Sequence, residues 1–295
     1  MVDDIKDWLS KTGYPLEMFV HKTVLSKSYL CEKSPIYSDA ELGVAREIDL
    51  AAFHHGMCTD EYSYSIQLIF ECKKSEKPLL VLSEFSSLAE RYENFFGDDS
   101  ISNDGPAAGF LGYSNLKNLS HEQRLESIGR FSEIIYSGYS VIPTFSKSDE
   151  NIYKGIMGLA SATEAYRNKY YEFFQSIRNE KTFHMTDRNP FQLLMPILVV
   201  DAKLYNAYLT DAGETNIEET DWASISIRLP WMLGKDGDER LCNIQIVRKD
   251  ALGSFLDAVG QLHKYISKPE IVSGAVIRST QTQNSIAFLR RLLRR

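Results

Sequence analysis

The pattern of apolar residues predicts two helices at the start of the chain. An apolar residue every three or four positions predicts a first helix over residues 2–9, which we expect Gly13 to end in the left-handed conformation. A second helix is predicted to begin near Pro15, because proline is favoured in the first helical turn. The apolar stripe of this helix is formed by Leu16, Phe19, Val20, Thr23 and Val24. Glu17 lies at the border of that stripe.

Alternation of apolar and polar residues predicts strands in the next part of the chain. Tyr29–Lys33 and Ile36–Ser38 indicate a first strand or pair of strands, and Arg46–His54 and Ser63–Lys73 alternate more clearly. The apolar faces of the last two are formed by Ile48, Leu50 and Ala52, and by Tyr64, Ile66, Leu68, Phe70 and Cys72. The opposite faces carry Glu47, Asp49 and Ala51, and Ser65, Gln67, Ile69, Glu71 and Lys73. We expect the connection His54–Ser63 to be a long hairpin loop.

The middle of the chain has a helical pattern. Helices are predicted over Leu88–Phe96, from Ser120 to about Tyr136 and over Ser148–Ile177. Gly97–Asn118 is rich in glycine, asparagine, serine and aspartate, and this composition predicts a loop or a small insertion.

A second group of strands follows. The near-continuous apolar run Leu194–Asp201 is typical of a strand that is covered on both faces, and Ala223–Pro230 and Leu241–Val247 are further strand candidates. Asp250 begins an amphipathic helix. Helices therefore flank strand groups at both ends of the chain. This arrangement predicts a single α/β domain over residues 1–295, built on a central mixed β-sheet flanked by helices.

Composition and charge narrow the class of protein. With 43% hydrophobic and 25% charged residues, the 295-residue chain is globular in composition and neither disordered nor fibrous. No apolar run reaches the ~20 residues of a transmembrane helix and the N-terminus has no secretion-signal pattern, so no membrane partner is expected. The net charge of −7 neither requires nor excludes a nucleic-acid partner. The cysteines form no CxxC pair, which predicts a cytoplasmic protein with reduced thiols at Cys31, Cys58, Cys72 and Cys242.

Charged residues stand next to apolar runs at three places. Asp49 lies on one predicted strand, Glu71 and Lys73 share a face of the next, and Glu17 is on the preceding helix. Carboxylates that meet on adjacent strands suit Mg²⁺, which prefers one or two carboxylates, several waters and a substrate phosphate; Mn²⁺ is the expected substitute. The backbone carbonyl of Cys72 is a further candidate metal ligand. The Lys73 ammonium suits water activation or charge stabilisation in phosphodiester hydrolysis.

This order of elements resembles the PD-(D/E)XK, or restriction-endonuclease-like, nuclease superfamily. The helix of that family is matched by PLEMFVHKTVL, its Asp-bearing strand by REIDLAA and its ExK strand by IQLIFECKK. The resemblance covers residues 15–83, with Ile48 in place of the proline of the family's Pro-Asp pair. It implies that Asp49 and Glu71 bind metal, Lys73 is catalytic, and Glu17 is an accessory ligand or positions water. The expected protein is a Mg²⁺-dependent nuclease acting on DNA, in restriction, repair or phage defence. Its core would be elaborated by a helical region over residues 84–180 and by strands and C-terminal helices over 190–295.

Two other interpretations remain open for this constellation. Glu71 and Lys73 can form a solvated cross-strand ion pair that has no chemical role. The protein can also be a nuclease-fold binding or structural subunit without turnover, which binds nucleic acid or a protein partner. No helix-turn-helix or zinc-finger reader is present, so specificity has to come from loops of the same domain, a homodimer or a protein partner.

Two further features of the sequence carry weaker expectations. His54, His55 and Cys58 suggest zinc, but a fourth ligand at tetrahedral-site spacing is missing, and loop solvation is the expectation. The C-terminal segment Ile286–Arg295 contains four arginines. It is interpreted either as a helix packed on the domain or as an arm that contacts phosphates; a membrane-surface anchor is disfavoured because the stretch is short.

Overall fold

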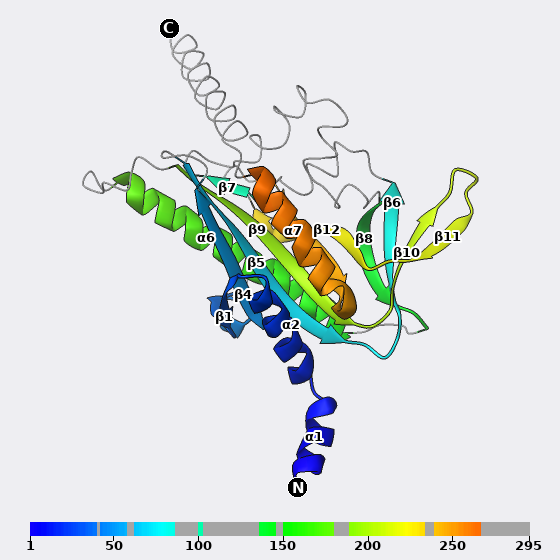
Figure 1. Ribbon diagram of the computed structural model, residues 1–295. Helices are drawn as coiled ribbons and strands as arrows, with labels where there is room; N and C mark the ends of the chain where they lie inside the picture. The colour runs from blue at the N-terminus through cyan, green and yellow to red at the C-terminus, as the bar shows by residue number, and fades with distance from the viewer. Residues whose placement is uncertain are drawn as a thin grey trace.

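A computed structural model describes residues 1–39, 42–57, 62–85, 100–102, 136–145, 150–179, 189–233 and 239–266 of the chain. In these residues a large mixed β-sheet has helices packed against both of its faces (Figure 1). The predicted α/β class is therefore confirmed. None of the helices in the described ranges is long and apolar enough to cross a membrane.

The described helices begin and end close to the predicted positions. They are α1 (Val2–Ser10), α2 (Tyr14–Ser26), α6 (Glu150–Asn179), the 3-10 turn η3 (Lys249–Ala251) and α7 (Leu252–Ile266). The prediction that Gly13 ends α1 in the left-handed conformation is wrong. Gly13 has φ −75° and is the N-cap of α2, whereas Lys11 caps α1. A turn of only a few residues joins the two helices and needs no left-handed residue there.

Within the described residues eleven strands form the main sheet, in the order β1-β4-β5-β9-β13-β12-β8-β6-β10-β11 with β7 paired to β9, and β2 and β3 form a separate pair. The strands are β1 (Leu30–Lys33), β2 (Ile36–Ser38), β3 (Ala45–Glu47), β4 (Leu50–Met57), β5 (Tyr62–Lys74), β6 (Leu79–Phe85), β7 (Ser100–Ser102), β8 (Tyr136–Pro143), β9 (Asn189–Asp201), β10 (Leu204–Leu209), β11 (Thr215–Glu219), β12 (Trp222–Leu233) and β13 (Glu239–Arg248). Parallel and antiparallel pairs alternate irregularly. β5 pairs with β4 antiparallel and with β9 parallel, so both predicted strand groups share one sheet.

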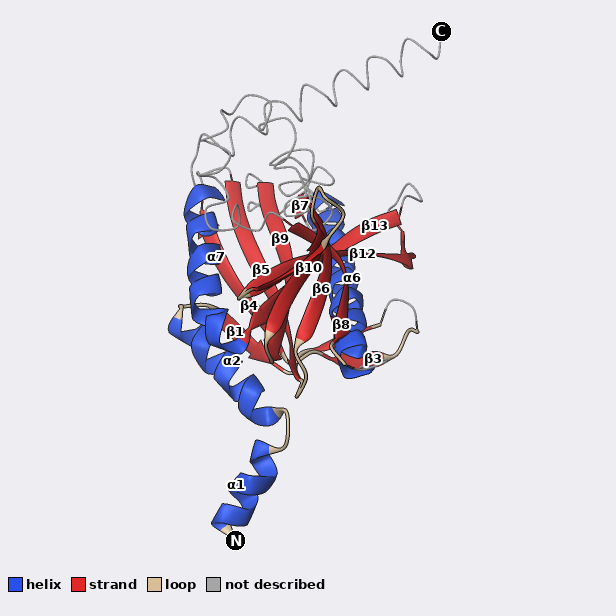
Figure 2. Ribbon diagram, turned by 90° about the vertical axis from the view of Figure 1, so that its right-hand side faces the viewer, coloured by secondary structure: helices blue, strands red, loops and turns tan. Residues whose placement is uncertain are grey.

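The sheet separates two hydrophobic cores. Figure 2 shows the helices that cover them on either side of the strands. Helices α2 and α7 cover one face, where Leu68 and Phe70 of β5 pack with Val20 and Phe255. Helix α6 covers the other face. The alternation predicted for β5 is confirmed, because Ile66, Leu68, Phe70 and Cys72 all belong to the core under α2 and α7.

The single strand predicted over Arg46–His54 is wrong. The chain breaks into β3 and β4 at Ile48 and Asp49, and Ile48 packs in the core under α6, whereas Leu50 packs under α2. The Ile48 N–H donates to the Pro35 carbonyl at 3.1 Å, and the Ser34 N–H donates to the Asp49 carbonyl at 3.2 Å. The backbone changes its pairing partner here, so the alternation of faces does not continue through the break.

The long hairpin loop predicted over His54–Ser63 is also wrong. The β4–β5 ladder continues as far as the pair Met57 and Ser63, so both histidines lie on a strand. β5 is held over its whole length by β9, whose ladder runs from Tyr62 paired with Asn189 to Lys74 paired with Asp201. This support allows β4 to extend further than the polar sequence of its last residues suggests.

The region over residues 84–180 is not a purely helical elaboration. It contains β7 and β8, while the helices predicted over residues 88–96 and 120–136 lie almost wholly outside the described residues. Gly138 explains how β8 fits between its neighbours. A Cβ at this position would lie 2.5 Å from Val81 Cγ1 and 2.7 Å from Ile225 Cγ2, so only glycine allows this close approach. The hairpin formed by β10 and β11 was also not predicted from the sequence.

Candidate active site

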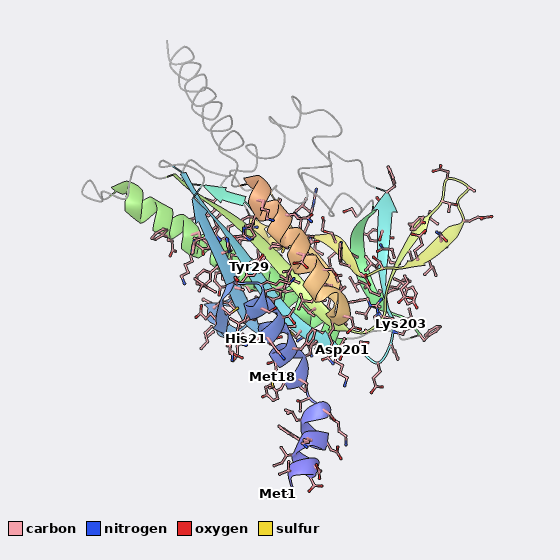
Figure 3. The ribbon with its side chains drawn as sticks, in the orientation of Figure 1. Met1, Met18, His21, Tyr29, Asp201 and Lys203 are labelled. Atoms are coloured by element: carbon pink, nitrogen blue, oxygen red, sulfur yellow. The ribbon has the colours of Figure 1, made fainter. Side chains whose placement is uncertain are left out.

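The candidate site lies where β4 separates from β5. The last pair of the ladder between these strands is Leu50 with Phe70. Asp49 and Glu71 are the next residues beyond this pair. The Asp49 side chain turns into the opening, and its Oδ2 accepts a hydrogen bond from the Cys72 N–H at 2.7 Å. The Asp49 carboxylate thus accepts the hydrogen bond that a backbone carbonyl would accept if the β4–β5 ladder continued. Figure 3 labels Asp201, which pairs with Lys74 and so marks the end of β5 that carries this site.

Glu71 and Lys73 share the face of β5 that is covered by α6, as their spacing predicts. Lys73 Nζ donates a hydrogen bond to Glu71 Oε1 at 2.5 Å. Only 12% of the Glu71 side chain and 24% of the Lys73 side chain are exposed, so the pair is not a fully solvated one. The interpretation as an open surface ion pair is wrong in this respect.

Helix α6 passes directly over Lys73 at a glycine. A Cβ on Gly155 would lie 3.0 Å from Lys73 Cε and 3.1 Å from Lys73 Cγ. The missing side chain therefore leaves the room in which the lysine stem lies between the helix and the sheet. The close packing holds the ammonium beside Glu71 and reduces the number of rotamers open to Lys73.

Cys72 contributes its backbone N–H to the site, and a hydrogen bond from its side chain also lowers the pKa of Asp49. Its thiol side points into the core under α2 and α7, and burial raises the Cys72 pKa well above its usual range. In an extended strand the N–H and C=O of one residue point to the same edge. Because the Cys72 N–H points to Asp49, the Cys72 carbonyl faces the same opening.

Glu17 comes from α2 and adds negative charge to the same region. Its pKa is raised, first by burial and then by the charges of Asp49 and Glu47, while Lys73 lowers it. The charge of Glu17 also raises the pKa of Glu71. The structure thus places Glu17 in the same electrostatic cluster as Asp49, Glu71 and Lys73, although no direct hydrogen bond joins it to them.

The carboxylates are held in an environment that disfavours their charged forms. Burial, followed by the charge of Asp49, raises the pKa of Glu71 to about 7, despite the opposing effect of Lys73. Burial also raises the pKa of Asp49, against the hydrogen bond from Cys72 and the charge of Lys73. For Lys73, burial lowers the pKa, but the charges and the hydrogen bond of the carboxylates outweigh it and raise the pKa overall. The lysine remains charged while the carboxylates repel one another.

Sequence reasoning missed several residues around the site. The Tyr37 hydroxyl donates to the Gly158 carbonyl at 3.2 Å and links β2 to α6. Arg46 Nε pairs at 2.8 Å with Asp39, whose side chain is only 6% exposed. Two glycines three residues apart in an otherwise regular helix, Gly155 and Gly158, were the available signal of a close approach.

The other sequence candidates lie elsewhere. His54 is on β4, where its ring contacts that of His263 from α7 in a tilted arrangement, with 4.4 Å between the ring centroids; the His55 ring contacts the edge of Phe53, with 5.3 Å between centroids. Both histidines lie on a strand and not in a loop, so that part of the expectation is wrong; His54 is half-buried, whereas His55 is exposed. Cys31, Cys72 and Cys242 are free thiols, while Cys58 and the segment Ile286–Arg295 lie outside the described residues.

In the described ranges no three histidine, cysteine, aspartate or glutamate side chains form a ready metal-binding group. No family model and no curated protein matches this chain, and no solved structure matches its fold. The chemistry of the site therefore has to be argued from its own residues.

Proposed function

We propose that this protein is a Mg²⁺-dependent nuclease that hydrolyses phosphodiester bonds in DNA, built on a restriction-endonuclease-like core. The observation that carries the proposal is the meeting of Asp49, Glu71 and Lys73 where β4 leaves β5. The order of the elements also supports it. A helix with Glu17 precedes the strand break at Asp49, and the strand with Glu71 and Lys73 follows, as in the PD-(D/E)XK resemblance.

The donor set fits a hard divalent cation. Asp49 and Glu71 supply carboxylate oxygens, and the Cys72 carbonyl faces the same opening. This is the ligand type that Mg²⁺ uses in phosphoryl transfer, with the remaining positions taken by water and substrate oxygens. The raised pKa values of Asp49 and Glu71 point the same way, because burial and neighbouring negative charges disfavour the two carboxylates and a bound cation would offset both effects. Glu17, whose charge acts on Glu71, would be an accessory ligand or position water.

The bound metal would supply Lewis-acid polarisation of the phosphate and an acidified water. Lys73 remains charged between the carboxylates and is directed by the packing of Gly155. Its ammonium can therefore donate hydrogen bonds to the phosphate oxygens as negative charge develops on them. The buried position strengthens this interaction, since little water screens it.

A cleavage assay tests the proposal. Purified protein is incubated with plasmid, linear and single-stranded DNA and with RNA, in Mg²⁺, in Mn²⁺ and in chelator. We expect DNA cleavage that depends on the metal and is lost by at least about 100-fold in Glu71→Ala and Lys73→Ala. Matched controls are Glu76→Ala and Lys74→Ala, because both side chains belong to exposed residues close by in the sequence. Both controls should cleave like the wild type, which excludes a contaminating nuclease.

Metal titration separates the role of Lys73 from that of the carboxylates. Calorimetric titration with Mn²⁺ should show weaker binding in Asp49→Asn, which loses a ligand charge. Binding should be unchanged or tighter in Lys73→Ala, because a neighbouring cation has been removed. Protein that is inert on every substrate with both metals would instead favour a nuclease-fold binding subunit without turnover.

A further inference from the structure

A groove of about 400 Å³ lies next to the candidate active site, between β1, β2 and α6. Its walls combine two tyrosine rings, an amide and three charged groups: Glu32, Tyr37, Tyr166, Asn168, Lys169 and Glu172. A space of this size is at the small end of ligand pockets. None of the proposed metal ligands lines the groove, so the groove is considered as a separate binding site.

The strand register places the groove beside the proposed phosphodiester site. Glu32 of β1 pairs with Ala51 of β4, which pairs with Ile69 of β5. Two strand spacings of about 5 Å each separate Glu32 from Ile69, and Ile69 precedes Glu71 by two residues, or about 7 Å along the strand. Tyr37 lies between the groove and the site. Its side chain lines the groove. Its pKa is raised mainly by burial, and the charge of Glu71 adds to this increase.

The charges of the groove argue against a phosphate as its occupant. Glu32 and Glu172 place two carboxylates against the single ammonium of Lys169. Carboxylates accept hydrogen bonds and repel phosphate oxygens, so they select groups that donate. The Tyr166 hydroxyl stays protonated at neutral pH, because burial, Glu32 and Tyr170 raise its pKa to about 12.

An unpaired base satisfies these constraints. Its planar face stacks on a tyrosine ring, as bases do in single-strand binding sites. The amino groups of adenine, cytosine and guanine donate to carboxylates, whereas thymine has no amino group and presents a carbonyl oxygen on each side of its single N3–H donor. We propose that this groove binds the unpaired, amino-bearing base of a nucleotide that neighbours the cleaved phosphodiester. The proposal rests on the proposed nuclease function for its biological meaning.

Nucleoside binding tests the groove without the metal site, since nucleosides contain no phosphate. Binding of deoxyadenosine, deoxycytidine, deoxyguanosine and thymidine to the full-length protein is measured by ligand-observed NMR in chelator. We expect at least one amino-bearing nucleoside to bind about 10-fold more tightly than thymidine. Glu32→Gln should remove this preference, because the new amide can donate to the thymine carbonyl. Tyr166→Ala should weaken binding of every nucleoside by about 10-fold, through the loss of stacking.

Two variants serve as controls for these effects. Tyr139→Ala removes an exposed tyrosine from β8, and Glu76→Gln neutralises an exposed carboxylate outside the groove. Both should bind nucleosides like the wild type. Glu32 is itself exposed, so Glu32→Gln should fold even if Tyr166→Ala does not. Equal binding of thymidine and the amino-bearing nucleosides, or an unchanged preference in Glu32→Gln, would overturn the groove proposal.

Cleavage of single-stranded oligonucleotides then distinguishes the two proposals. Substrates carry one adenine, cytosine or guanine in a run of thymines, and the cleaved positions are mapped. Cuts should cluster beside the amino-bearing base and spread along the strand in Glu32→Gln. Nucleoside preference without any cleavage would overturn the nuclease function and leave the groove in place. Metal-dependent cleavage with no base preference would overturn the groove alone.

Discussion

The two faces of β5 differ in their chemistry. One face places Ile66, Leu68 and Phe70 in the core beneath α2 and α7, where each is fully buried among apolar side chains. The other face lies beneath α6 and carries Gln67, Glu71 and Lys73. Both faces belong to a single strand, because successive side chains point in opposite directions.

The comparison shows how one strand serves both stability and chemistry. The apolar face gains free energy from burial and has no charge to compensate. The α6 face holds carboxylates whose raised pKa values record unfavourable burial and mutual repulsion. Such a site is stable only because the opposite face and the surrounding sheet provide the missing free energy. Substitutions on the two faces should therefore differ in sign as well as in size.

The largest expected effect is on the apolar face. Phe70→Ala should lower the free energy of unfolding by about 3–5 kcal/mol, because it leaves a cavity in a core where Phe70 is 0% exposed. Phe85→Ala is the matched control, since Phe85 is 72% exposed and should change stability by less than about 0.5 kcal/mol. Denaturant unfolding measures both values. Similar losses in the two variants would contradict the assigned face of Phe70.

The next effect is on the α6 face and has the opposite sign. Glu71 has a pKa of about 7 in the folded state and 4.5 as its ordinary value, so the folded state holds an extra proton between these pH values. The free energy of unfolding therefore falls as the pH rises from 4.5 to 7. Glu71→Gln removes this group and, in chelator at pH 8, should be more stable than the wild type by up to about 3 kcal/mol.

Bound metal should make the wild type more stable than Glu71→Gln. Mg²⁺ or Mn²⁺ stabilises the wild type by binding the folded state, and the variant gains less. Thermal unfolding at pH 5 and pH 8, with metal and with chelator, measures both effects. A wild-type stability that is flat through this pH range in chelator would argue against a raised Glu71 pKa.

The face under α7 should respond to acid in the other direction. Burial, and then the charge of His54, lowers the pKa of His263 from 6.5 to about 3. Below pH 6.5 His263 binds a proton in the unfolded state but not in the folded state, so the free energy of unfolding falls as the pH drops below 6.5. At pH 5 this amounts to about 2 kcal/mol. His263→Phe should remove that loss, whereas His55→Phe, at an exposed position, should keep it.

The smallest stability effects are expected at two glycines of α6. Gly158→Ala meets no atom within 4 Å of its new Cβ and should stabilise the helix by about 1 kcal/mol. Gly155→Ala places its Cβ 3.0 Å from Lys73 Cε, so the gain in helix propensity is offset by displacement of the lysine. Cleavage should fall about 10-fold or more in Gly155→Ala and remain unchanged in Gly158→Ala. Equal activity in both variants would show that the position of Lys73 does not matter.

Some of the site could be predicted because it depends on spacing along one strand. Glu71 and Lys73 are two residues apart in a clearly alternating segment, so their common face follows from the pleat alone. That the apolar run Leu194–Asp201 forms a second strand, and that α2, α6 and α7 are helices, also followed from hydrophobic periodicity. These features depend on the pattern within one segment, whereas the pairing of the two strands does not.

Only the tertiary structure decided where Asp49 points. The sequence placed Asp49 in the middle of a regular strand, but competition between β5 and the β1–β2 connection for backbone hydrogen bonds breaks the strand there. The break turns the carboxylate toward the Cys72 N–H. The contacts of Gly155 with Lys73 and of Tyr37 with Gly158 likewise join residues far apart in the chain. Such contacts depend on which elements pack together, and a periodic pattern in one segment contains no information about its partner in another.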